Sequence, residues 1–596
     1  MYPVSFFGVP VTLKHSEKSI RRRENNDEKA TNFPPTIPPL LQKIYQNRSV
    51  SDFSEIEKSL SKLRPYHSLK GIDDATNLLY KHLCDQSHIV IIGDFDADGA
   101  TSTTVAVKCL RMLGASYVDF LVPDRFKYGY GLTPEIVKAA NEKYSPDLIV
   151  TVDNGISSVD GVAAALEANI EVLVTDHHLA GNTLPNAHAI VNPNQPGDIF
   201  PSKNLAGVGV IFYVMLALRN KLRERNWFQE RNIPQPNLSS VLDIVALGTV
   251  ADVVPLDLNN RILVNQGLKR VRVGEACPGI KALIEISGRN ERSLVATDFG
   301  FSLGPRLNAA GRLEDMAIGI NCLLSDNLQQ ARMLASQLDA LNSERKEIES
   351  QMQLGALETL AQLNFDENEL PMGMCLYDES WHQGVIGILA SRIKDKLHRP
   401  VIIFAKGDNG EIKGSARSIP GIHIRDILDS VATNNPGLIT KFGGHAMAAG
   451  LSISENAFRI FQSSFDAEVS LKIKPEYLEQ VILSDGELKD NELTLSMAEL
   501  LKNAEPWGQA FPEPIFDGIF SVTQRRVVGE KHLKLQLQPA NSNLKLEAIA
   551  FNAIDPQDAE IPFDVGSSIQ AAYKLDVNEF RGNRTLQLII DYLEVT

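Results

Sequence analysis

Short apolar runs alternate with helical patterns over about residues 70 to 270. The runs are rich in β-branched residues and read IVIIGD, VDFLVPD, LIVTVDNG, EVLVTDHH and IVALGTVADVV. Each has the length of a buried strand, and segments with helical spacing lie between them. Strands that alternate with helices predict βαβ units and therefore a parallel sheet covered by helices.

Three different patterns follow along the chain. Residues 326–364 contain no proline and only one glycine, Gly355, and their apolar positions recur at helical spacing, which predicts one long helix. A second α/β segment extends from about 370 to 465 and contains the runs CLYDESW, VIGILASRIKDKL and PVIIFAK. From about 470 to the end, five runs alternate like strands, which favours a small barrel of the oligonucleotide-binding (OB) kind, with a β-sandwich as the alternative.

A chain of 596 residues is too long to form a single core. The changes of pattern divide it into five parts. The fold class is α/β, with a terminal β-barrel. We expect a flexible N-terminal arm over residues 1–45, a parallel-sheet domain over 46–325, a connecting helix over 326–365, a smaller α/β domain over 366–468 and an OB-like, nucleic-acid-binding barrel over 469–596.

Composition and charge narrow the class of protein. The chain is 43% hydrophobic and 22% charged, and it has no apolar stretch of about 18 residues that could span a membrane. Its N-terminus places apolar residues before the charged ones, the reverse of a secretory signal. The five cysteines form no CxxC pair, which suits a reducing cytoplasm. A net charge of −15 disfavours broad electrostatic binding to DNA or anionic lipid, although a local basic track remains compatible with nucleic acid.

Acidic residues follow the predicted strands. In an open parallel sheet, ligands bind beyond the carboxyl ends of the strands, so we expect these acidic ends to converge. Three of the predicted strands end in acidic residues, and a fourth acidic position follows the apolar run VALGTVA. The residues are Asp94, Asp96 and Asp98 after IVIIG, Asp153 after LIVTV, the triplet Asp176, His177 and His178 after VLVT, and Asp252.

The segment DFDADG also resembles the start of a calcium-binding EF-hand loop. Such a loop needs a bidentate glutamate at its twelfth position, which here is Val105, and a helix rather than a strand before it. Taken singly, DFDADG and VDNG are more often turns, and a buried histidine is more often a core residue. Four acidic ends in one predicted sheet, one of them with two histidines, favour a metal site instead.

The chemistry of the expected cluster indicates the metal. Carboxylates that are brought together repel one another and take up protons unless a cation lies between them. Aspartate oxygens with one or two imidazoles suit Mn²⁺ or Mg²⁺ better than zinc or calcium. The donors suffice for two ions, and a pair about 3.5–4 Å apart would activate a water and stabilise both oxygens of an in-line displacement at phosphorus.

The series GDFDADG, VDNG, DHH and ADVVPL, in this order, resembles the motifs of the DHH phosphoesterase family. The segments GPRLNAAGR (304–312), WHQGVIGILASR (381–392), GSARS (414–418) and GGHAMAAG (443–450) resemble the second lobe of that family, the DHHA1 domain. With the long helix and the OB-like tail, residues 45–596 are similar to the bacterial 5′→3′ exonucleases of the family that act on single-stranded DNA.

The resemblance implies roles for individual residues. Two Mn²⁺ or Mg²⁺ ions would bind Asp96, Asp98, Asp153, His177 and Asp252, and Asp94 would be a ligand or lie beside one. His178 would face the scissile phosphate, with the orientation of a neighbouring group as its alternative role, and Asp176 would position the histidines. Many relatives have a histidine where this chain has Ile92, so one ion would have fewer nitrogen donors here.

Several motifs combine glycine with arginine or histidine, a combination that suits phosphate because arginine forks pair with its oxygens and glycine lets backbone N–H groups approach. For each residue the alternative is a solvated loop side chain. The expected substrate-binding residues are Arg125, Arg306, Asn308, Arg312, Ser415, Arg417, Gly444 and His445.

The resemblance implies an exonuclease that releases mononucleotides from the 5′ end of single-stranded DNA in repair and recombination. We expect this protein to be cytoplasmic and monomeric. The resemblance adds a single-strand-binding protein and a recombination helicase as partners, and no membrane is expected. One alternative is a DHH enzyme for short oligoribonucleotides or cyclic dinucleotides, but such relatives are shorter and lack the C-terminal domain. Another is a catalytically inactive DNA-binding scaffold, in which degraded ligands would be expected.

Overall fold

The computed structural model describes residues 18–24, 32–123, 131–362, 370–529, 531–540, 542–554, 561, 563–580 and 582–596. The chain divides into two compact units. The larger unit comprises Arg23–Asn342 and Asp485–Thr596, and the smaller unit comprises Met1–Arg22 and Ser343–Ser484.

A five-stranded, fully parallel sheet lies in the larger unit, in the order β3-β2-β4-β5-β6. The chain proceeds from β2 to β3 on one side and then returns past β2 to β4, so the strand order reverses between β2 and β4. Ligands bind at such a switch point in open α/β sheets. The strands are β2 (His88–Ile92), β3 (Tyr117–Leu121), β4 (Leu148–Val152), β5 (Glu171–Thr175) and β6 (Ala189–Val191).

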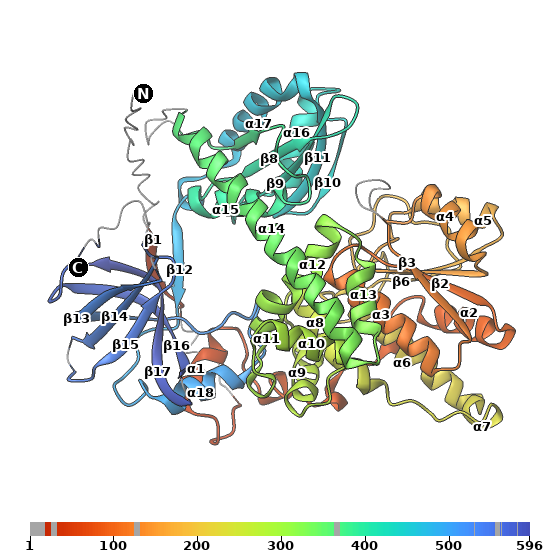
Figure 1. The fold of residues 1–596 in the computed structure, drawn as a ribbon, viewed down its shortest axis with the longest axis horizontal. Coiled ribbons are helices and arrows are strands. Elements are labelled where there is room, and N and C mark those ends of the chain that lie inside the picture. Colours follow the sequence, from red (N-terminus) through yellow and green to blue (C-terminus); the bar gives the residue numbers. More distant parts are fainter. Residues whose placement is uncertain are drawn as a thin grey trace, which may run out of the picture. The chain divides into compact units, whose positions relative to one another are not determined.

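Helices cover both faces of this sheet (Figure 1). Ile89, Ile91 and Val150 pack with the helices of one face, α2 (Ile72–Asp85), α3 (Ala97–Met112) and α6 (Gly207–Glu224). Val90, Ile92 and Val174 pack in a second core with α4 (Pro134–Tyr144) and α5 (Val159–Glu167) on the other face. Burial on two faces explains why the strands are apolar at successive positions rather than at alternate ones.

The apolar run before Asp252, which the sequence pattern suggests is a strand of the sheet, is a helix, α8 (Leu242–Ala251). Its first eight residues are all buried, so its sequence has no polar face, and periodicity cannot distinguish such a segment from a buried strand. Further helices of this unit are α1 (Pro39–Gln46), α7 (Trp227–Glu230), α9 (Leu258–Arg272), α10 (Pro278–Ile286), α11 (Ala296–Asp298), α12 (Gly304–Leu313) and α13 (Ala317–Leu324).

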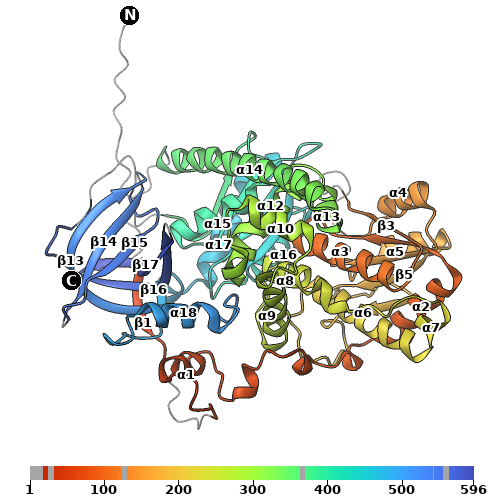
Figure 2. The same ribbon diagram turned by 60° about the horizontal axis from the view of Figure 1, so that its bottom comes forward.

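The C-terminal strands of the larger unit form a closed barrel in the order β13-β14-β15-β17-β16 (Figure 2). This confirms the barrel and excludes the sandwich alternative. α18 (Leu495–Ala504) precedes the barrel, whose core is continuous with that of the parallel-sheet part. The strands are β13 (Phe516–Val528), β14 (His532–Pro539), β15 (Leu546–Ala550), β16 (Ser568–Phe580) and β17 (Asn583–Val595).

The smaller unit contains a mixed sheet in the order β10-β11-β9-β8-β7, in which only β7 and β8 are parallel. The predicted long helix is confirmed as α14 (Leu328–Gln362), which begins in the larger unit and continues into the smaller one. The other elements are β7 (Met374–Tyr377), α15 (Ile386–Leu397), β8 (Val401–Lys406), β9 (Glu411–Arg417), α16 (Ile424–Asn434), β10 (Lys441–Gly444), β11 (Ala448–Ser454) and α17 (Phe458–Lys472).

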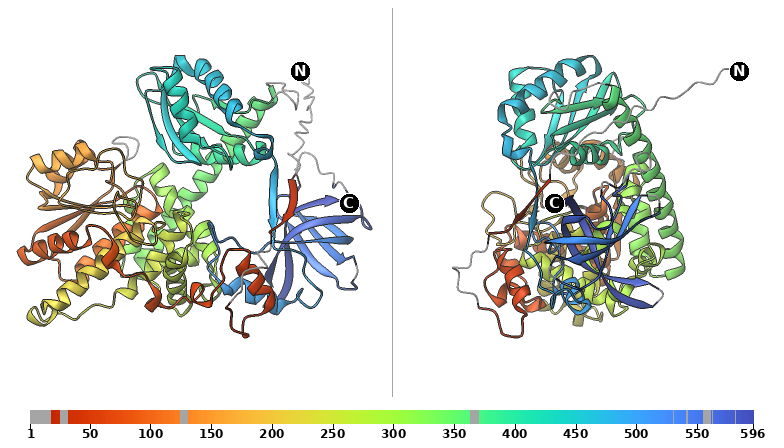
Figure 3. Two further views of the ribbon diagram at one scale, coloured as in Figure 1. Left: turned by 180° about the vertical axis from the view of Figure 1, so that it is seen from behind. Right: turned by 90° about the vertical axis from the view of Figure 1, so that its left-hand side faces the viewer.

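Ordered elements occur within the range that the sequence suggests is a flexible arm. β1 (Lys18–Arg22) pairs in parallel with β12 (Gln480–Ser484), the red and light-blue strands in Figure 3. α1 buries Leu40, Leu41 and Ile44. The five residues of β1 are mostly polar, and their partner lies far away in the chain, so no local pattern marks this strand. Residues 1–17 and 25–31 lie outside the described residues.

Among the described residues, no helix combines the length and the apolar character needed to cross a bilayer.

A buried ion pair joins Arg48, just after the end of α1, to Asp485 at the start of the barrel segment. Both oxygens of Asp485 accept from Arg48, Oδ1 from Nη1 at 2.9 Å and Oδ2 from Nη2 at 3.1 Å, and Oδ1 also accepts from Asn47 Nδ2 at 2.8 Å. Both charged side chains are 1% exposed. Because water does not solvate these buried charges, removal of either partner destabilises the fold.

We therefore predict that Arg48→Ala destabilises the larger unit by about 3–5 kcal/mol, because it removes both close hydrogen bonds from a guanidinium to the buried Asp485 carboxylate and leaves only Arg23, whose Nε lies 3.8 Å from Oδ1. Urea unfolding followed by tryptophan fluorescence measures the change. Lys138→Ala, which removes an exposed ion pair with Glu142, is the control and should leave the urea midpoint unchanged. An Arg48→Ala midpoint equal to that of the control would contradict the assignment.

Candidate metal centre

The loop after β2 turns directly into α3 and places three aspartates at the switch point. Asp96 is the N-cap of α3, and its Oδ1 accepts from Gly99 N at 2.9 Å. Asp94 Oδ1 accepts from Phe95 N at 2.7 Å. A helix N-terminus favours negative charge, so α3 supports the carboxylates of this loop.

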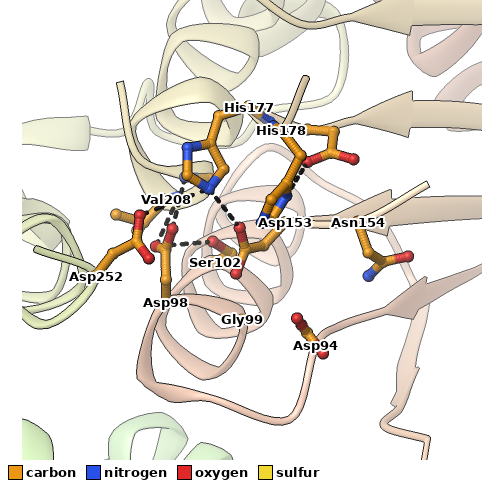
Figure 4. A network of polar contacts seen from close by, with 12 residues as sticks. Asp94, Asp98, Gly99, Ser102, Asp153, Asn154, His177, His178, Val208 and Asp252 are labelled. Atoms are coloured by element: carbon orange, nitrogen blue, oxygen red, sulfur yellow. Dashed lines mark hydrogen bonds and ion pairs between the residues drawn. The ribbon is translucent and has the colours of Figure 1, made fainter. Parts of the chain in front are cut away.

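Asp98 is held by a second helix. Its Oδ2 accepts from Gly207 N at 2.6 Å and its Oδ1 from Val208 N at 3.0 Å, and these are the first two residues of α6 (Figure 4). The N–H groups of a helix start have no partner within the helix, so Asp98 satisfies them. The carboxylate is thereby fixed between α3 and α6.

Asp153, directly after β4, adopts a left-handed backbone conformation with φ of 62°. A non-glycine residue in this region is strained and indicates that the surroundings impose the geometry. Asn154 Nδ2 donates to Ile92 O at 3.1 Å and to Val152 O at 2.9 Å, and so bridges the ends of β2 and β4. Gly207 is required here, since a Cβ at this position would lie 2.6 Å from Asp153 Oδ1.

His177 connects two of the aspartates. Its Nε2 lies 3.1 Å from Asp153 Oδ1 and 3.5 Å from Asp252 Oδ2 (Figure 4). Asp252 is the C-cap of α8, so it reaches the centre from a helix rather than from a strand of the sheet.

Asp176 orients the two histidines. Its Oδ1 accepts from His177 N at 2.7 Å and from His178 N at 3.1 Å, and lies 2.7 Å from His178 Nδ1, while its Oδ2 accepts from Ile156 N at 2.9 Å. Both oxygens of this buried carboxylate are therefore engaged within the protein. The side chain of His178 is 32% exposed, so a substrate can reach it.

The structure brings seven of the predicted residues into three overlapping groups, in each of which the ligand atoms lie within 4.8 Å of one another. Asp153 belongs to two groups and so does His177, which is the arrangement expected of two neighbouring ions. Oxygen donors with a minority of imidazoles fit Mn²⁺ or Mg²⁺. The groups are Asp153, His177 and His178; Asp98, His177 and Asp252; and Asp94, Asp96 and Asp153.

Burial and mutual repulsion raise the pKa values of the clustered carboxyl groups. Burial, and then the charges of Asp98, Asp96, Asp252 and Asp94, raise the pKa of Asp153 well above its ordinary range, and burial and neighbouring aspartates do the same to the pKa of Asp252. Burial and the charge of Asp96 raise the pKa of Asp98 to about 7. Burial alone would lower the pKa of His178, but its hydrogen bond to Asp176 and the aspartate charges raise it to about 9.

Ile92 occupies the position where many relatives have a histidine. Its side chain is fully buried in the apolar core that contains Ile136, Val162 and Val174. It therefore contributes packing to the sheet and no donor atom to the cluster.

The predicted substrate-binding residues lie in different parts of the molecule. Arg306 in the larger unit is engaged by Asp339, and Asn308 Oδ1 accepts from Ala97 N at 2.8 Å. Arg312 is the last basic residue of α12. Ser415, Arg417, Gly444 and His445 belong to the smaller unit, so their relation to the carboxylates stays a prediction. Arg125 lies outside the described residues.

Sequence reasoning missed the groups that hold the carboxylates. They include the start of α6, Asn154, and two asparagines after β6: Asn192 Nδ2 donates to His178 O at 2.9 Å, and Asn194 Nδ2 to His177 O at 2.6 Å. The sequence marks these groups only by NPN directly after a strand and by AGVG at the start of a helix. Both patterns are too common to have indicated contacts with the carboxylates or histidines.

The raised pKa values predict how stability responds to pH and metal. A carboxyl group whose pKa is higher in the folded than in the unfolded protein destabilises the fold once the pH exceeds the unfolded pKa. For Asp98 without metal, this destabilisation grows from about pH 4 to about pH 7 and is constant above that. Mn²⁺ should therefore raise the melting temperature strongly at about pH 7.5 and much less at about pH 5.5, where protons compete.

Differential scanning fluorimetry with and without Mn²⁺ measures this effect. Asp153→Ala should remove most of the Mn²⁺-induced shift, whereas Asp160→Ala, an exposed aspartate of α5, should keep it. An equal Mn²⁺-induced shift at both pH values, or in both variants, would contradict a carboxylate cluster that exchanges protons for metal.

Comparison with known proteins identifies the family. The DHH family N-terminal domain matches residues 88–249, the DHHA1 domain matches 371–471 and the RecJ OB domain matches 484–592. These matches confirm the predicted fold class and its order of parts. The chain is 53% identical to the single-stranded-DNA-specific exonuclease RecJ of Escherichia coli (strain K12) over 96% of this chain and 98% of that one.

A second curated relative, RecJ of Haemophilus influenzae, is 51% identical over 93% of this chain and 96% of its own length. The crystal structure of RecJ from Thermus thermophilus in complex with Mn²⁺ matches with a TM-score of 0.76 and 28% identity, over 95% of this chain and 79% of that one. The chain therefore belongs to the RecJ family of single-stranded-DNA-specific exonucleases.

Proposed function

We propose that this protein removes mononucleotides from the 5′ end of single-stranded DNA by two-metal-ion hydrolysis of the phosphodiester bond. The observation that carries this proposal is the set of three overlapping ligand groups at the switch point between β2 and β4. The family relationship supports single-stranded DNA as the substrate. The 5′→3′ polarity follows from the resemblance of the motifs.

The donor set fits Mn²⁺ or Mg²⁺, the ions bound in solved RecJ structures from Thermus thermophilus. Asp94, Asp96, Asp98, Asp153, His177 and Asp252 would hold two ions, and crowded carboxylates with raised pKa values are the groups that a divalent cation stabilises. When bound, the ions would activate water and stabilise the charge that develops on the phosphate oxygens.

His178 would act on the substrate directly. Asp176 fixes the imidazole through Nδ1, which directs Nε2 away from Asp176. Burial alone would lower the pKa of His178, but the hydrogen bond to Asp176 raises it and favours the protonated imidazole, whose Nε2–H would form a hydrogen bond to a phosphate oxygen. Burial alone would raise the pKa of Asp176, but the hydrogen bond and charge of His178, the charge of His177 and the Ile156 N–H lower it. The carboxylate therefore stays charged and maintains the orientation of His178.

The smaller unit would bind the DNA backbone through Arg417 and Ser415. Arg417 Nη1 donates to Ala416 O at 2.8 Å and contacts Ser415 Oγ at 3.2 Å. A Cβ on Gly387 would lie 2.9 Å from Arg417 Nη2 and 3.0 Å from Ser415 Oγ, so the guanidinium and the hydroxyl pack directly against the start of α15. Gly444, the last residue of β10, with φ of 141°, and His445 in the turn between β10 and β11 would supply backbone contacts.

The barrel would bind more distant nucleotides of a long strand. Four cations among the described residues of its strands are ion-paired, and their charge is therefore partly neutralised. The pairs are Arg525 with Asp564, Lys534 with Glu547, Lys574 with Glu513 and Arg584 with Glu499. Roles in repair and recombination, with a single-strand-binding protein and a recombination helicase as partners, rest on the family alone. The cytoplasmic location rests on the cysteines and the N-terminal pattern, and the monomeric state stays a prediction.

The decisive assay compares a 5′-labelled single strand, its duplex and a cyclic dinucleotide, each with Mn²⁺, Mg²⁺ or chelator. We expect mononucleotides from the single strand only, and only with metal. Asp153→Ala and His177→Ala should lower the rate by at least about a thousandfold, because metal stabilisation of the transition state is lost, and should leave single-strand binding in chelator largely unchanged. Asp160→Ala is the control. Near-normal rates in either site variant would refute the proposal.

Arg417→Ala should weaken single-strand binding about tenfold or more, because a charged hydrogen-bond donor to phosphate is lost. Gly387→Ala should weaken binding in the same direction but less, since the added methyl meets only side-chain ends of Arg417 and Ser415 that can shift. Fluorescence anisotropy in chelator measures the affinity. Arg425→Ala, an exposed arginine of α16, is the control. Unchanged affinity in both Arg417→Ala and Gly387→Ala would exclude a role of this cradle in DNA binding.

A further inference from the structure

Helix α12 contacts the segment from Asp94 to Asp98 at the start of α3, which we call the aspartate loop. This contact is non-local, since 211 residues separate Ala97 from Asn308. Asn308 Oδ1 accepts from Ala97 N at 2.8 Å. Ala97 is the first residue of α3, so its N–H has no acceptor within that helix. The start of α3 is therefore capped twice, by Asp96 from its own chain segment and by Asn308 from α12.

Gly311 brings the backbone of α12 against the same loop. A Cβ at Gly311 would lie 1.7 Å from Phe95 O and 2.8 Å from Phe95 C, so no side chain fits at this position. Residues 308 and 311 are three apart and lie on one face of α12. This face contacts the loop backbone at Phe95 and at Ala97, the two residues that flank Asp96.

The helix is itself anchored on another side. Arg306 Nε and Nη2 each lie 2.8 Å from Asp339 Oδ1 on α14, and Arg306 Nη1 donates to Ser302 O at 2.5 Å. α12 is thus fixed to α14 while its Asn308–Gly311 face fixes the aspartate loop. All these residues belong to the larger unit.

We infer that Asn308 and Gly311 are positioning residues for the metal centre: they hold the backbone on both sides of Asp96 and so place the carboxylates of Asp96 and Asp98. This inference rests on the proposed function of the centre. It differs from the role that the sequence suggests for Asn308, which is contact with the DNA strand. The two roles predict opposite effects on metal binding and on DNA binding.

Asn308→Ala should raise the dissociation constant for Mn²⁺, measured by electron paramagnetic resonance without DNA, by about tenfold or more, as expected for a group that orients ligands. Single-strand affinity in chelator should stay within about twofold of the unmodified protein, and the Mn²⁺ concentration for half-maximal rate should rise in parallel. Asn308→Asp should bind Mn²⁺ more tightly than Asn308→Ala, because its carboxylate oxygen can accept from the same N–H.

Gly311→Ala tests the second contact independently. The added methyl must displace Phe95, so Mn²⁺ affinity should fall at least as far as in Asn308→Ala. Two matched controls make the same kinds of substitution elsewhere in the chain. Gly355→Ala places a methyl where no atom lies within 4 Å, and Asn47→Ala removes an asparagine hydrogen bond of 2.8 Å that is remote from the centre. Both should retain Mn²⁺ affinity.

Weaker single-strand binding in Asn308→Ala with unchanged Mn²⁺ affinity would overturn the inference and favour contact with DNA. Should Asn308→Ala not fold, the comparison of Asn308→Asp and Gly311→Ala with the controls decides in the same way. If the variants lose Mn²⁺ but the unmodified protein hydrolyses no single-stranded DNA, the proposed function fails while the positioning role stands. The two failures are therefore distinguishable.

Discussion

Electrostatic repulsion among buried carboxylates sets the conditions for the rest of this structure. Asp98 and Asp153 are almost completely buried, and Asp94, Asp96 and Asp252 lie close enough to raise the pKa of Asp153. Such a cluster is unfavourable in the folded chain at neutral pH unless a cation lies within it. The fold therefore has to hold the acids together by other contacts until a cation arrives.

Those contacts come mainly from the backbone. The starts of α3 and α6 donate N–H groups to Asp96 and Asp98, and three N–H groups fix Asp176. Asp153 and Val253, the residue after Asp252, both adopt left-handed conformations, which for a β-branched valine is a clear outlier. Strain of this kind persists only where the surrounding structure determines the conformation, as is typical of functional sites.

Local sequence patterns predicted the parts of the fold that depend on local rules. The apolar strands, the acids at their ends and the long helix follow from periodicity and from the geometry of parallel sheets. α8 and β1 did not, because the first has no polar face and the second depends on a partner more than 450 residues away. The contact of Asn308 with Ala97 is likewise non-local, so the motif GPRLNAAGR suggested substrate binding while the structure places this asparagine against the aspartate loop.

The most direct test is a crystal structure of the protein grown with Mn²⁺ and measured at the manganese absorption edge. The account predicts two anomalous peaks about 3.5–4 Å apart, one bounded by Asp94, Asp96 and Asp153 and the other by Asp98, His177 and Asp252. Ions found only elsewhere, or an empty cluster in protein that hydrolyses single-stranded DNA, would contradict it.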